Sequence, residues 1–316
     1  MLVYWEMHDL GIIYPNRPMI YKGIYHLFYQ YNPRSEVWGY IVWGHSTSTD
    51  LVNWTIHPPA LLPSKPYDIN GCWSGSATIL KDGTPAILYT GIDSNNNQFQ
   101  NLAMPKNPSD PYLIEWIKSP HIPIMEPNDM NNINSTLFRD PTTAWLGHDG
   151  RWRVIVGNER EHNIGTALLY TSMDFIHWTG IEHPLLSSNE TGMWECPDFI
   201  PVSNVKHVLK VRVFQSQVEY YTIGTYDHDM DIFFPDSGSV DNESGLRLDY
   251  GKYYASKSFF DSEKERRILL AWFNESTSAN IDIMKGWSGL QADVEISFTI
   301  PSFDRAEVYD SNWRNP

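Results

Sequence analysis

The chain has 316 residues, of which 41% are apolar and 19% are charged, and its formal net charge is −15. This is the composition of a globular protein of about two domains, and the lack of a long apolar run predicts no transmembrane helix and no membrane partner. The acidic charge disfavours a nucleic-acid partner because it repels phosphates, and two cysteines are too few for a disulfide framework or a cysteine-rich zinc site.

Strand-like runs begin at five places along the chain, and four of them contain a short turn followed by a stronger strand. The runs are Met19–Tyr31, Trp73–Gly91, Phe138–Gly157, Trp194–Val202 and Lys252–Phe273. The turns are Lys22–Gly23, Lys81–Thr84, Gly147–Gly150 and Asp261–Lys264. Asp-Gly and related turns between β-rich segments are typical of hairpins. Because long segments with helical periodicity are almost lacking, the sequence predicts an all-β fold.

Three tryptophans recur at a constant spacing, since Trp54, Trp116 and Trp178 lie 62 residues apart. Five units of about 60 residues predict a five-bladed β-propeller, in which the first strand of each blade lines a central channel. A two-sheet sandwich is the alternative, but it does not account for the recurrence. In the propeller, residues at the starts of successive units converge on one channel.

Two carboxylates stand at the starts of neighbouring units, Asp140 in the third and Glu195 in the fourth, with aromatic residues beside them. Glycosidases need two carboxyl groups that flank one glycosidic bond, so this placement indicates a glycosidase site. The alternative for each residue alone is structural. Asp140 would then cap the turn before Pro141, and Glu195 would be a solvated strand end.

Five Asn-X-Ser/Thr triplets indicate N-glycosylation and therefore a secretory route. They begin at Asn53, Asn134, Asn189, Asn242 and Asn274. The alternative is that they are unused triplets in polar loops. The segment Met1–Trp5 lacks the pattern of a signal peptide, which conflicts with the triplets. We therefore expect the N-terminal sequence to be incomplete or altered.

Several strings together resemble plant β-fructofuranosidases of glycoside hydrolase family 32, the acid invertases and fructan exohydrolases. They are Tyr21–Pro33, Trp38-Gly39, Trp73–Ala77, Phe138–Pro141, Trp194–Asp198, Tyr253–Phe259 and Gly286–Gln291. The resemblance implies a five-bladed propeller followed by a β-sandwich module. It also implies a retaining hydrolysis of terminal β-fructofuranosyl residues of sucrose or fructans, without a metal or an organic cofactor, by a monomer. The Cys196-Pro197 pair resembles the cell-wall type, which implies an extracellular location, with the vacuole as the alternative.

The resemblance also implies roles for single residues. Glu195 corresponds to the acid/base, and Asp140, with Arg139 beside it, to the transition-state stabiliser. The residues that match the fructosyl pocket are Asn16, Gln30, Trp38, Trp73 and Ser74. Phe214 stands where invertases carry an aspartate that holds the glucose of sucrose, which slightly favours fructan exohydrolase specificity. The alternative is that Phe214 only packs a strand.

Departures from the family occur at both ends of the resemblance. The nucleophilic aspartate of the family is replaced by Tyr14, the nearby glycine has become Arg17, and the nearest carboxylate, Asp9, lies five residues out of register. We expect an atypical segment over residues 1–14, a propeller over 15–291 and a fragment of the sandwich over 292–316. Two hypotheses follow. The chain is either a β-fructofuranosidase with impaired catalysis or an inactive pseudoenzyme that binds fructosides or has a regulatory role.

Overall fold

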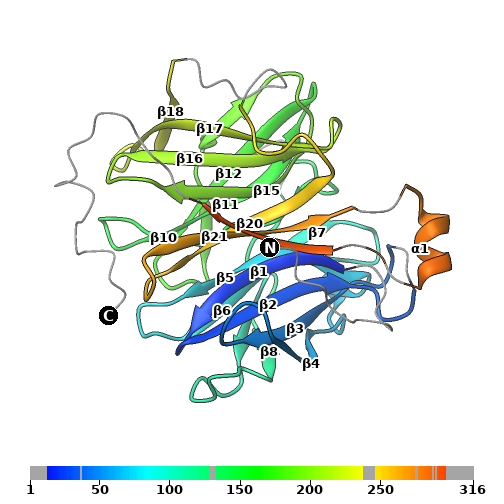
Figure 1. The fold of residues 1–316 in the computed structure, drawn as a ribbon. Helices are drawn as coiled ribbons and strands as arrows, with labels where there is room; N and C mark the ends of the chain where they lie inside the picture. Colours follow the sequence, from blue (N-terminus) through cyan, green and yellow to red (C-terminus); the bar gives the residue numbers. More distant parts are fainter. Residues whose placement is uncertain are drawn as a thin grey trace.

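The strands of the chain form five antiparallel sheets that follow one another in sequence order (Figure 1). The computed structural model describes residues 13–35, 38–127, 133–237, 246–274, 277–286, 288 and 290–296. Within these ranges, the helical elements are a 3-10 turn, η1 (Pro66–Asp68), and a short helix, α1 (Ala279–Lys285). None of the helices in the described ranges is long and apolar enough to cross a membrane.

The bounds of the strands show where each sheet begins and ends. The first sheet contains β1 (Ile13–Tyr21), β2 (Ile24–Tyr31), β3 (Val42–Ser48) and β4 (Trp54–Leu61). The second contains β5 (Gly71–Ile79), β6 (Pro85–Ile92), β7 (Gln98–Pro105) and β8 (Trp116–Lys118). The third contains β9 (Phe138–Arg139), β10 (Trp145–Leu146), β11 (Trp152–Arg160), β12 (Ile164–Ser172), β13 (Trp178–Gly180) and β14 (Leu186–Ser188).

The last two sheets complete the arrangement. The fourth contains β15 (Trp194–Pro201), β16 (Lys206–Val213), β17 (Val218–Asp227), β18 (Ile232–Pro235) and β19 (Leu246–Arg247). The fifth contains β20 (Tyr253–Asp261), β21 (Arg266–Phe273) and β22 (Leu290–Ile296). The expected limits of the propeller, after residues 14 and 291, fall within β1 and β22. A sandwich fragment over 292–316 stays a prediction, because residues 297–316 lie outside the described ranges.

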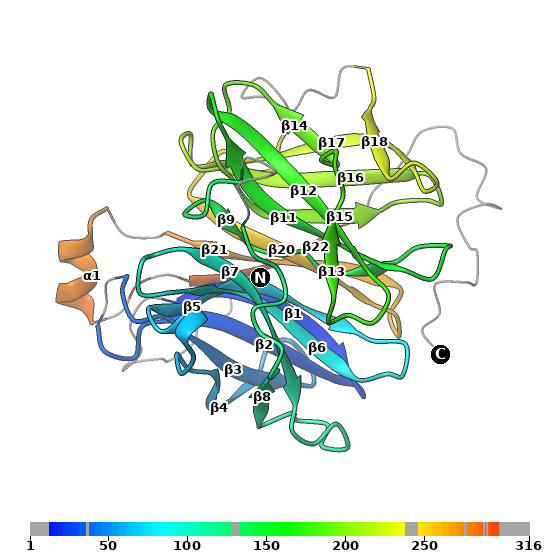
Figure 2. The same ribbon diagram turned by 180° about the vertical axis from the view of Figure 1, so that it is seen from behind.

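The sheets close into a ring, with their first strands next to one another (Figures 1 and 2). β1 contacts β5, β5 contacts β9, β11 contacts β15, β15 contacts β20, and β20 contacts β1 again. Apolar clusters fill the space between neighbouring sheets, and one of them joins Tyr25 and Leu27 of the first sheet to Phe259 and Ile268 of the fifth. The arrangement is that of a β-propeller, as the sequence predicted.

The tryptophan recurrence marks the same place in three sheets. Trp54, Trp116 and Trp178 each begin the fourth strand of a sheet, namely β4, β8 and β13. The indole Nε1 of Trp54 donates to the Leu51 carbonyl at 3.1 Å, and that of Trp178 donates to Phe175 at 3.0 Å. For Trp54 and Trp178 the recurrence therefore reflects one repeated turn that leads into the outer strand, whereas Trp116 Nε1 has no partner among the described residues.

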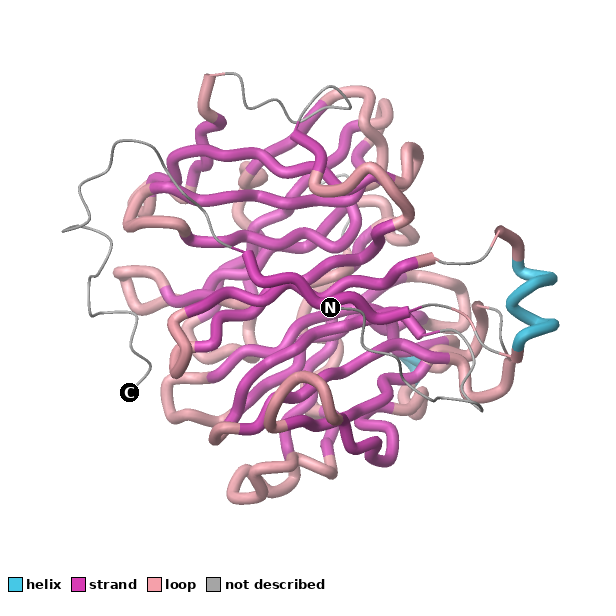
Figure 3. Tube along the Cα trace, in the orientation of Figure 1, coloured by secondary structure: helices cyan, strands magenta, loops and turns pink. Residues whose placement is uncertain are grey.

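The third and fourth sheets contain six and five strands, more than the four of each of the first two sheets, because some of their strands are interrupted. β9 and β10 both pair with β11, β13 and β14 both pair with β12, and β18 and β19 both pair with β17. The first of these breaks follows Asp140, which has a φ of 67° and precedes Pro141. A left-handed residue followed by proline interrupts the ladder of hydrogen bonds, because proline has no N–H group to donate. Each pair of fragments therefore occupies the place of a single strand. Figure 3 shows strands throughout the ring, with the helix α1 projecting from one side.

Buried histidines are a further feature of the core. His26 Nδ1 lies 3.0 Å from His45 Nε2, and His26 Nε2 lies 3.0 Å from the Pro111 carbonyl. A carbonyl can only accept, so His26 donates through Nε2, and in the neutral ring its Nδ1 accepts from His45 Nε2. Burial lowers the pKa of His26 and of His207 from 6.5 to about 4, and it lowers the pKa of His45 well below the ordinary value.

We expect the free energy of unfolding to fall as the pH falls from 6.5 to about 4. In this window the unfolded chain binds protons that the buried rings exclude, so each histidine contributes a slope of about 1.4 kcal/mol per pH unit. Urea unfolding at several pH values measures this slope. His207→Phe keeps the stacking on Phe199, whose ring centroid lies 4.6 Å away, and should reduce the slope by one histidine. Equal slopes in both proteins would contradict the prediction.

Candidate active site

The first strands of four sheets have an irregularity near their beginnings, and the first strand of the third sheet is interrupted. The register shifts in β1, β5, β15 and β20 lie at Pro15/Pro18, Trp73/Gly75, Glu195/Asp198 and Tyr254/Lys257. Left-handed backbone occurs beside three of these sites, at Asp140, Cys196 and Ala255. Bulges redirect side chains and are frequent beside active sites. In the first strand of each sheet, selected side chains therefore depart from the regular alternation between the two faces of the sheet.

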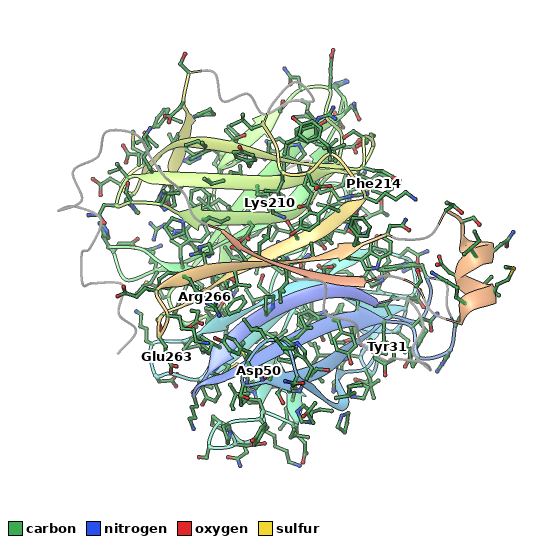
Figure 4. The ribbon with its side chains drawn as sticks, in the orientation of Figure 1. Tyr31, Asp50, Lys210, Phe214, Glu263 and Arg266 are labelled. Atoms are coloured by element: carbon green, nitrogen blue, oxygen red, sulfur yellow. The ribbon has the colours of Figure 1, made fainter. Side chains whose placement is uncertain are left out.

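These irregularities lie at one end of the ring. In Figure 4, Tyr31 and Phe214 lie on the side from which α1 projects, whereas Glu263 and Arg266 lie on the opposite side. Tyr31 pairs with Ile13 at the start of β1, and Phe214 directly follows β16, whose last residue pairs with Trp194. The starts of β1 and β15 therefore open on the same end of the molecule.

The structure brings Asp140 and Glu195 together in the buried centre of this end. Arg139 Nη2 donates to Glu195 Oε1 at 2.8 Å, and its Nε donates to the same oxygen at 3.2 Å. The Cys196 amide donates to Asp140 Oδ2 at 2.8 Å. Burial raises the pKa of Asp140, and the Arg139 charge opposes that shift. A carboxylate pair on neighbouring first strands is thus present, as the sequence predicted.

The close approach of the third and fourth sheets depends on a glycine. A Cβ atom added to Gly157 on β11 would overlap the carbonyl oxygen of Trp194, the residue before Glu195. Gly157 also pairs with Arg139. The missing side chain at this position therefore allows the strands that carry Arg139 and Glu195 to lie in contact.

A second arginine, Arg212, also belongs to the site, although no sequence pattern indicates it, and it donates through Nη1 to Glu195 Oε2. Arg212 pairs with Glu195 across β16 and β15, and its guanidinium carbon lies 4.0 Å from the ring centroid of Tyr254. Burial raises the pKa of Tyr254 well above its ordinary value. The signal in the sequence was weak, because charged residues that alternate with apolar ones on a strand are typical of a solvated face.

A second group of expected site residues lies on the first and second sheets. Ser74 Oγ donates to Gln30 Oε1 at 3.2 Å, and the rings of Trp38 and Trp73 meet edge to face at 5.4 Å. Trp73 pairs with Thr90, whose hydroxyl oxygen accepts the Asp140 amide at 2.9 Å. This contact joins the aromatic group to the carboxylate group.

Two donors in this second group are buried without a protein partner among the described residues, namely Gln30 Nε2 and Trp73 Nε1. Buried polar atoms in native structures nearly always have a partner in the protein, in water or in a ligand. The two atoms are therefore available to hold a water molecule or a polar ligand.

The remaining expected site residues lie at the margin of this region or beyond the described part. Phe214 is half exposed, and its ring centroid lies 5.9 Å from the guanidinium carbon of Arg139. Tyr14 pairs with Gln30 through the backbone of β1. The side chains of Tyr14 and Asn16, and the whole of Asp9, lie outside the described residues, so their roles stay predictions.

The glycosylation sites also stay predictions. Asn53, Asn134 and Asn189 are exposed, Asn274 is half-buried, and Asn242 lies outside the described residues. Within the ranges that the structure describes, no group of three His, Cys, Asp or Glu side chains is arranged to hold a metal ion.

Comparisons with known proteins give consistent results. Insoluble β-fructofuranosidase isoenzyme CWINV1 of Arabidopsis thaliana is 58% identical over 294 residues, which are 88% of this chain and 50% of the relative. Fructan 6-exohydrolase of Beta vulgaris is 59% identical over 295 residues, which are 88% of this chain and 48% of the relative. The chain therefore spans about half the length of these curated relatives.

A solved structure has the same fold over most of the chain. Fructan 1-exohydrolase IIa of Cichorium intybus, a variant of which was crystallised with 1-kestose, matches with a TM-score of 0.87 and 46% identity. The match covers 92% of this chain and 57% of that chain. The model for the glycosyl hydrolases family 32 N-terminal domain matches residues 13–297. The chain therefore belongs to glycoside hydrolase family 32, the family of the β-fructofuranosidases and fructan exohydrolases.

Proposed function

We propose that the chain is a glycosidase of the β-fructofuranosidase type, which releases terminal fructosyl residues from sucrose or fructans with retention. The observation that carries the proposal is the buried pair of Asp140 and Glu195 on neighbouring first strands, joined through Arg139 and the Cys196 amide. Glu195 would protonate the leaving group and later activate water, and Asp140 would hold the fructosyl hydroxyls. Both steps require groups within hydrogen-bond reach of the sugar.

The fructosyl unit would lie between the carboxylate pair and the aromatic group of the first two sheets. Gln30 Nε2 and Trp73 Nε1 lack protein acceptors among the described residues, and hydroxyl oxygens of a sugar would supply them. Trp38 adds a partly exposed ring beside Trp73, which suits contact with a sugar face. Asn16 and Ser74 would complete the pocket.

Phe214 bears on the choice between substrates. It is half exposed beside Arg139 and has no charge to hold the glucose of sucrose. An apolar ring at this place favours a fructan over sucrose.

Catalysis by this chain is expected to be impaired because Tyr14 stands at the nucleophile position. Retaining glycosidases use a second carboxylate about 5–5.5 Å from the acid to form a covalent intermediate. A phenol with its ordinary pKa of about 10 stays protonated at mildly acidic pH and is a poor nucleophile. An inactive pseudoenzyme that binds fructosides is therefore the alternative function.

The wider context of the chain is proposed on the same basis. The similarity to insoluble and cell-wall isoenzymes supports an extracellular location, with the vacuole as the alternative. The match to isoenzyme CWINV3 of Arabidopsis thaliana extends over 371 aligned positions although this chain has 316 residues, so part of that relative has no counterpart within the aligned region. We expect a monomer that needs no cofactor.

We expect the unaltered chain not to reach the rate typical of the family when it is incubated with sucrose or 1-kestose and the release of fructose is measured. Replacing Tyr14 with Asp, together with Arg17→Gly, should raise the rate because it restores a carboxylate nucleophile. The measurement is free fructose after incubation of each purified protein with either sugar. In the restored protein, Glu195→Gln is the control and should lower turnover by about 10²–10⁴-fold. Turnover of the unaltered chain at a family-like rate would exclude the pseudoenzyme.

Phe214→Asp in the restored protein should shift the preference from 1-kestose toward sucrose by about tenfold in kcat/KM. The reason is that a charged hydrogen bond to a hydroxyl contributes about 1.5–3 kcal/mol. Phe260→Asp is a matched control, since both rings are 50% exposed and each lies beside an arginine. An equal shift in both variants would remove Phe214 from substrate selection.

Asp140→Asn should raise the melting temperature at about pH 7 and abolish turnover in the restored protein. Burial raises the pKa of Asp140, so its ionised form destabilises the folded state above that pKa. The gain should shrink as the pH falls through this raised pKa, because the aspartate then becomes protonated. Asp231→Asn is the control, because Asp231 is paired with Arg153 and its loss should destabilise. A lower melting temperature for Asp140→Asn at neutral pH would contradict the prediction.

A further inference from the structure

Side chains of the second sheet hold the backbone of β9 and of the residue that follows it. The Phe138 amide donates to Gln98 Oε1 at 2.8 Å, and the Phe138 carbonyl accepts from Gln100 Nε2 at 2.8 Å. The Asp140 amide donates to the hydroxyl oxygen of Thr90 at 2.9 Å. All three residues of the second sheet are buried, and Thr90 and Gln100 have no exposed surface. These contacts therefore belong to the packed joint between the second and third sheets.

The hydrogen bonds through Thr90 can run in one direction only. The Phe138 carbonyl has no proton to give, so Gln100 presents its amide nitrogen to that carbonyl and its Oε1 to Thr90. The Thr90 hydroxyl donates to this Oε1 at 2.9 Å, and the two residues lie opposite each other on β6 and β7. The Thr90 oxygen is then the acceptor for the Asp140 amide. Gln100 thus sets the orientation of the Thr90 hydroxyl.

Asp140 needs support of this kind because of its backbone. Its φ is 67°, in the left-handed region, which residues other than glycine keep only where their surroundings hold them. Thr90 holds the Asp140 amide from the second sheet, and the Cys196 amide holds Asp140 Oδ2 from the fourth sheet at 2.8 Å. The direction of the carboxylate therefore depends on contacts with both neighbouring sheets.

We propose that Thr90, oriented by Gln100, is a positioning residue for Asp140. Its hydroxyl oxygen holds the left-handed backbone that directs the Asp140 carboxylate toward the fructosyl hydroxyls. This inference rests on the proposed function of Asp140 as the group that holds these hydroxyls. Hydrogen bonds to the sugar that strengthen in the transition state depend on exact placement of the carboxylate, so Thr90 acts on turnover through Asp140.

The second sheet offers a matched control residue. The hydroxyl oxygen of Thr78 on β5 accepts the Ala144 amide of the third sheet at 2.9 Å. Thr78 and Thr90 are both buried, and each accepts one backbone amide across the same joint. Replacing either threonine with valine leaves a buried amide without its acceptor at nearly unchanged volume. Because the Thr78 bond reaches Ala144 and not Asp140, a difference between the two variants reports on Asp140.

The contact can be tested on the chain as it exists by hydrogen exchange of backbone amides, followed by nitrogen-15 NMR of aspartate-labelled protein. The Asp140 signal is identified by its loss in Asp140→Asn. In Thr90→Val the Asp140 amide should exchange faster by about tenfold, the factor that corresponds to one hydrogen bond. Thr90→Ser keeps the hydroxyl and should retain the slow exchange, and Thr78→Val should leave the Asp140 rate unchanged.

The effect on turnover can be measured in the restored protein. Thr90→Val should lower kcat for 1-kestose by about 10–10²-fold while KM changes much less, because a misplaced carboxylate loses its bonds mainly in the transition state. Thr90→Ser should keep most of the activity. Thr78→Val should keep the kcat of the restored protein, although it removes a hydrogen bond of the same kind.

The outcomes separate this proposal from the proposed function. An unchanged exchange rate at Asp140 in Thr90→Val, an unchanged kcat, or an equal loss of kcat in Thr78→Val would overturn the proposal. If Thr90→Val does not fold, Gln100→Met removes the acceptor that orients the Thr90 hydroxyl and should also speed exchange at Asp140, and an unchanged rate there would overturn the proposal as well. Failure of the restored protein to hydrolyse any fructoside would count against the proposed function, and the exchange rates would still decide whether Thr90 holds Asp140.

Discussion

Two carboxylates are buried where the five sheets meet, and their negative charge must be balanced by nearby cations and N–H donors. The arrangement of the site follows from this requirement. Removing an ionised carboxylate from water costs several kcal/mol unless cations and N–H groups surround it. Arg139, Arg212 and the Cys196 amide supply this surrounding for Asp140 and Glu195. Each donor comes from a different strand, so the site exists only when the third and fourth sheets are in contact.

The backbone around Glu195 is held by a second layer of buried charge. Lys210 Nζ donates to the carbonyls of Cys196 and Ser256, at 3.0 and 2.5 Å, and lies 3.7 Å from Glu219. Cys196 and Ala255, the residue before Ser256, both have left-handed backbone. One lysine thus joins two irregular strands of neighbouring sheets (Figure 4). The fourth and fifth sheets meet through polar contacts at this point, which ties the conformation beside Glu195 to closure of the ring.

The features that could be predicted from the sequence are those with a local signal. Turns rich in glycine and aspartate indicate the hairpins, and the recurrent tryptophans indicate the repeat of about 60 residues. The pair of Asp140 and Glu195 followed from their position at the starts of units. Arg212 could not be found in this way, because a strand residue is buried or exposed according to its neighbours in other sheets. The left-handed backbone at Cys196 could not be predicted either, because the residue is not a glycine and its conformation depends on contacts that form only in the folded ring.

The closure of the ring has a consequence for how the protein is made. Tyr25 donates to Asp261, 236 residues further along the chain, and both belong to sheets that share an apolar cluster. During synthesis Tyr25 and Leu27 of the first sheet therefore stay exposed to solvent until most of the chain has left the ribosome. Contacts between such distant segments form slowly, and uncovered apolar strands are prone to aggregate. We expect the nascent chain to depend on chaperones until the fifth sheet has been synthesised and packs against the first.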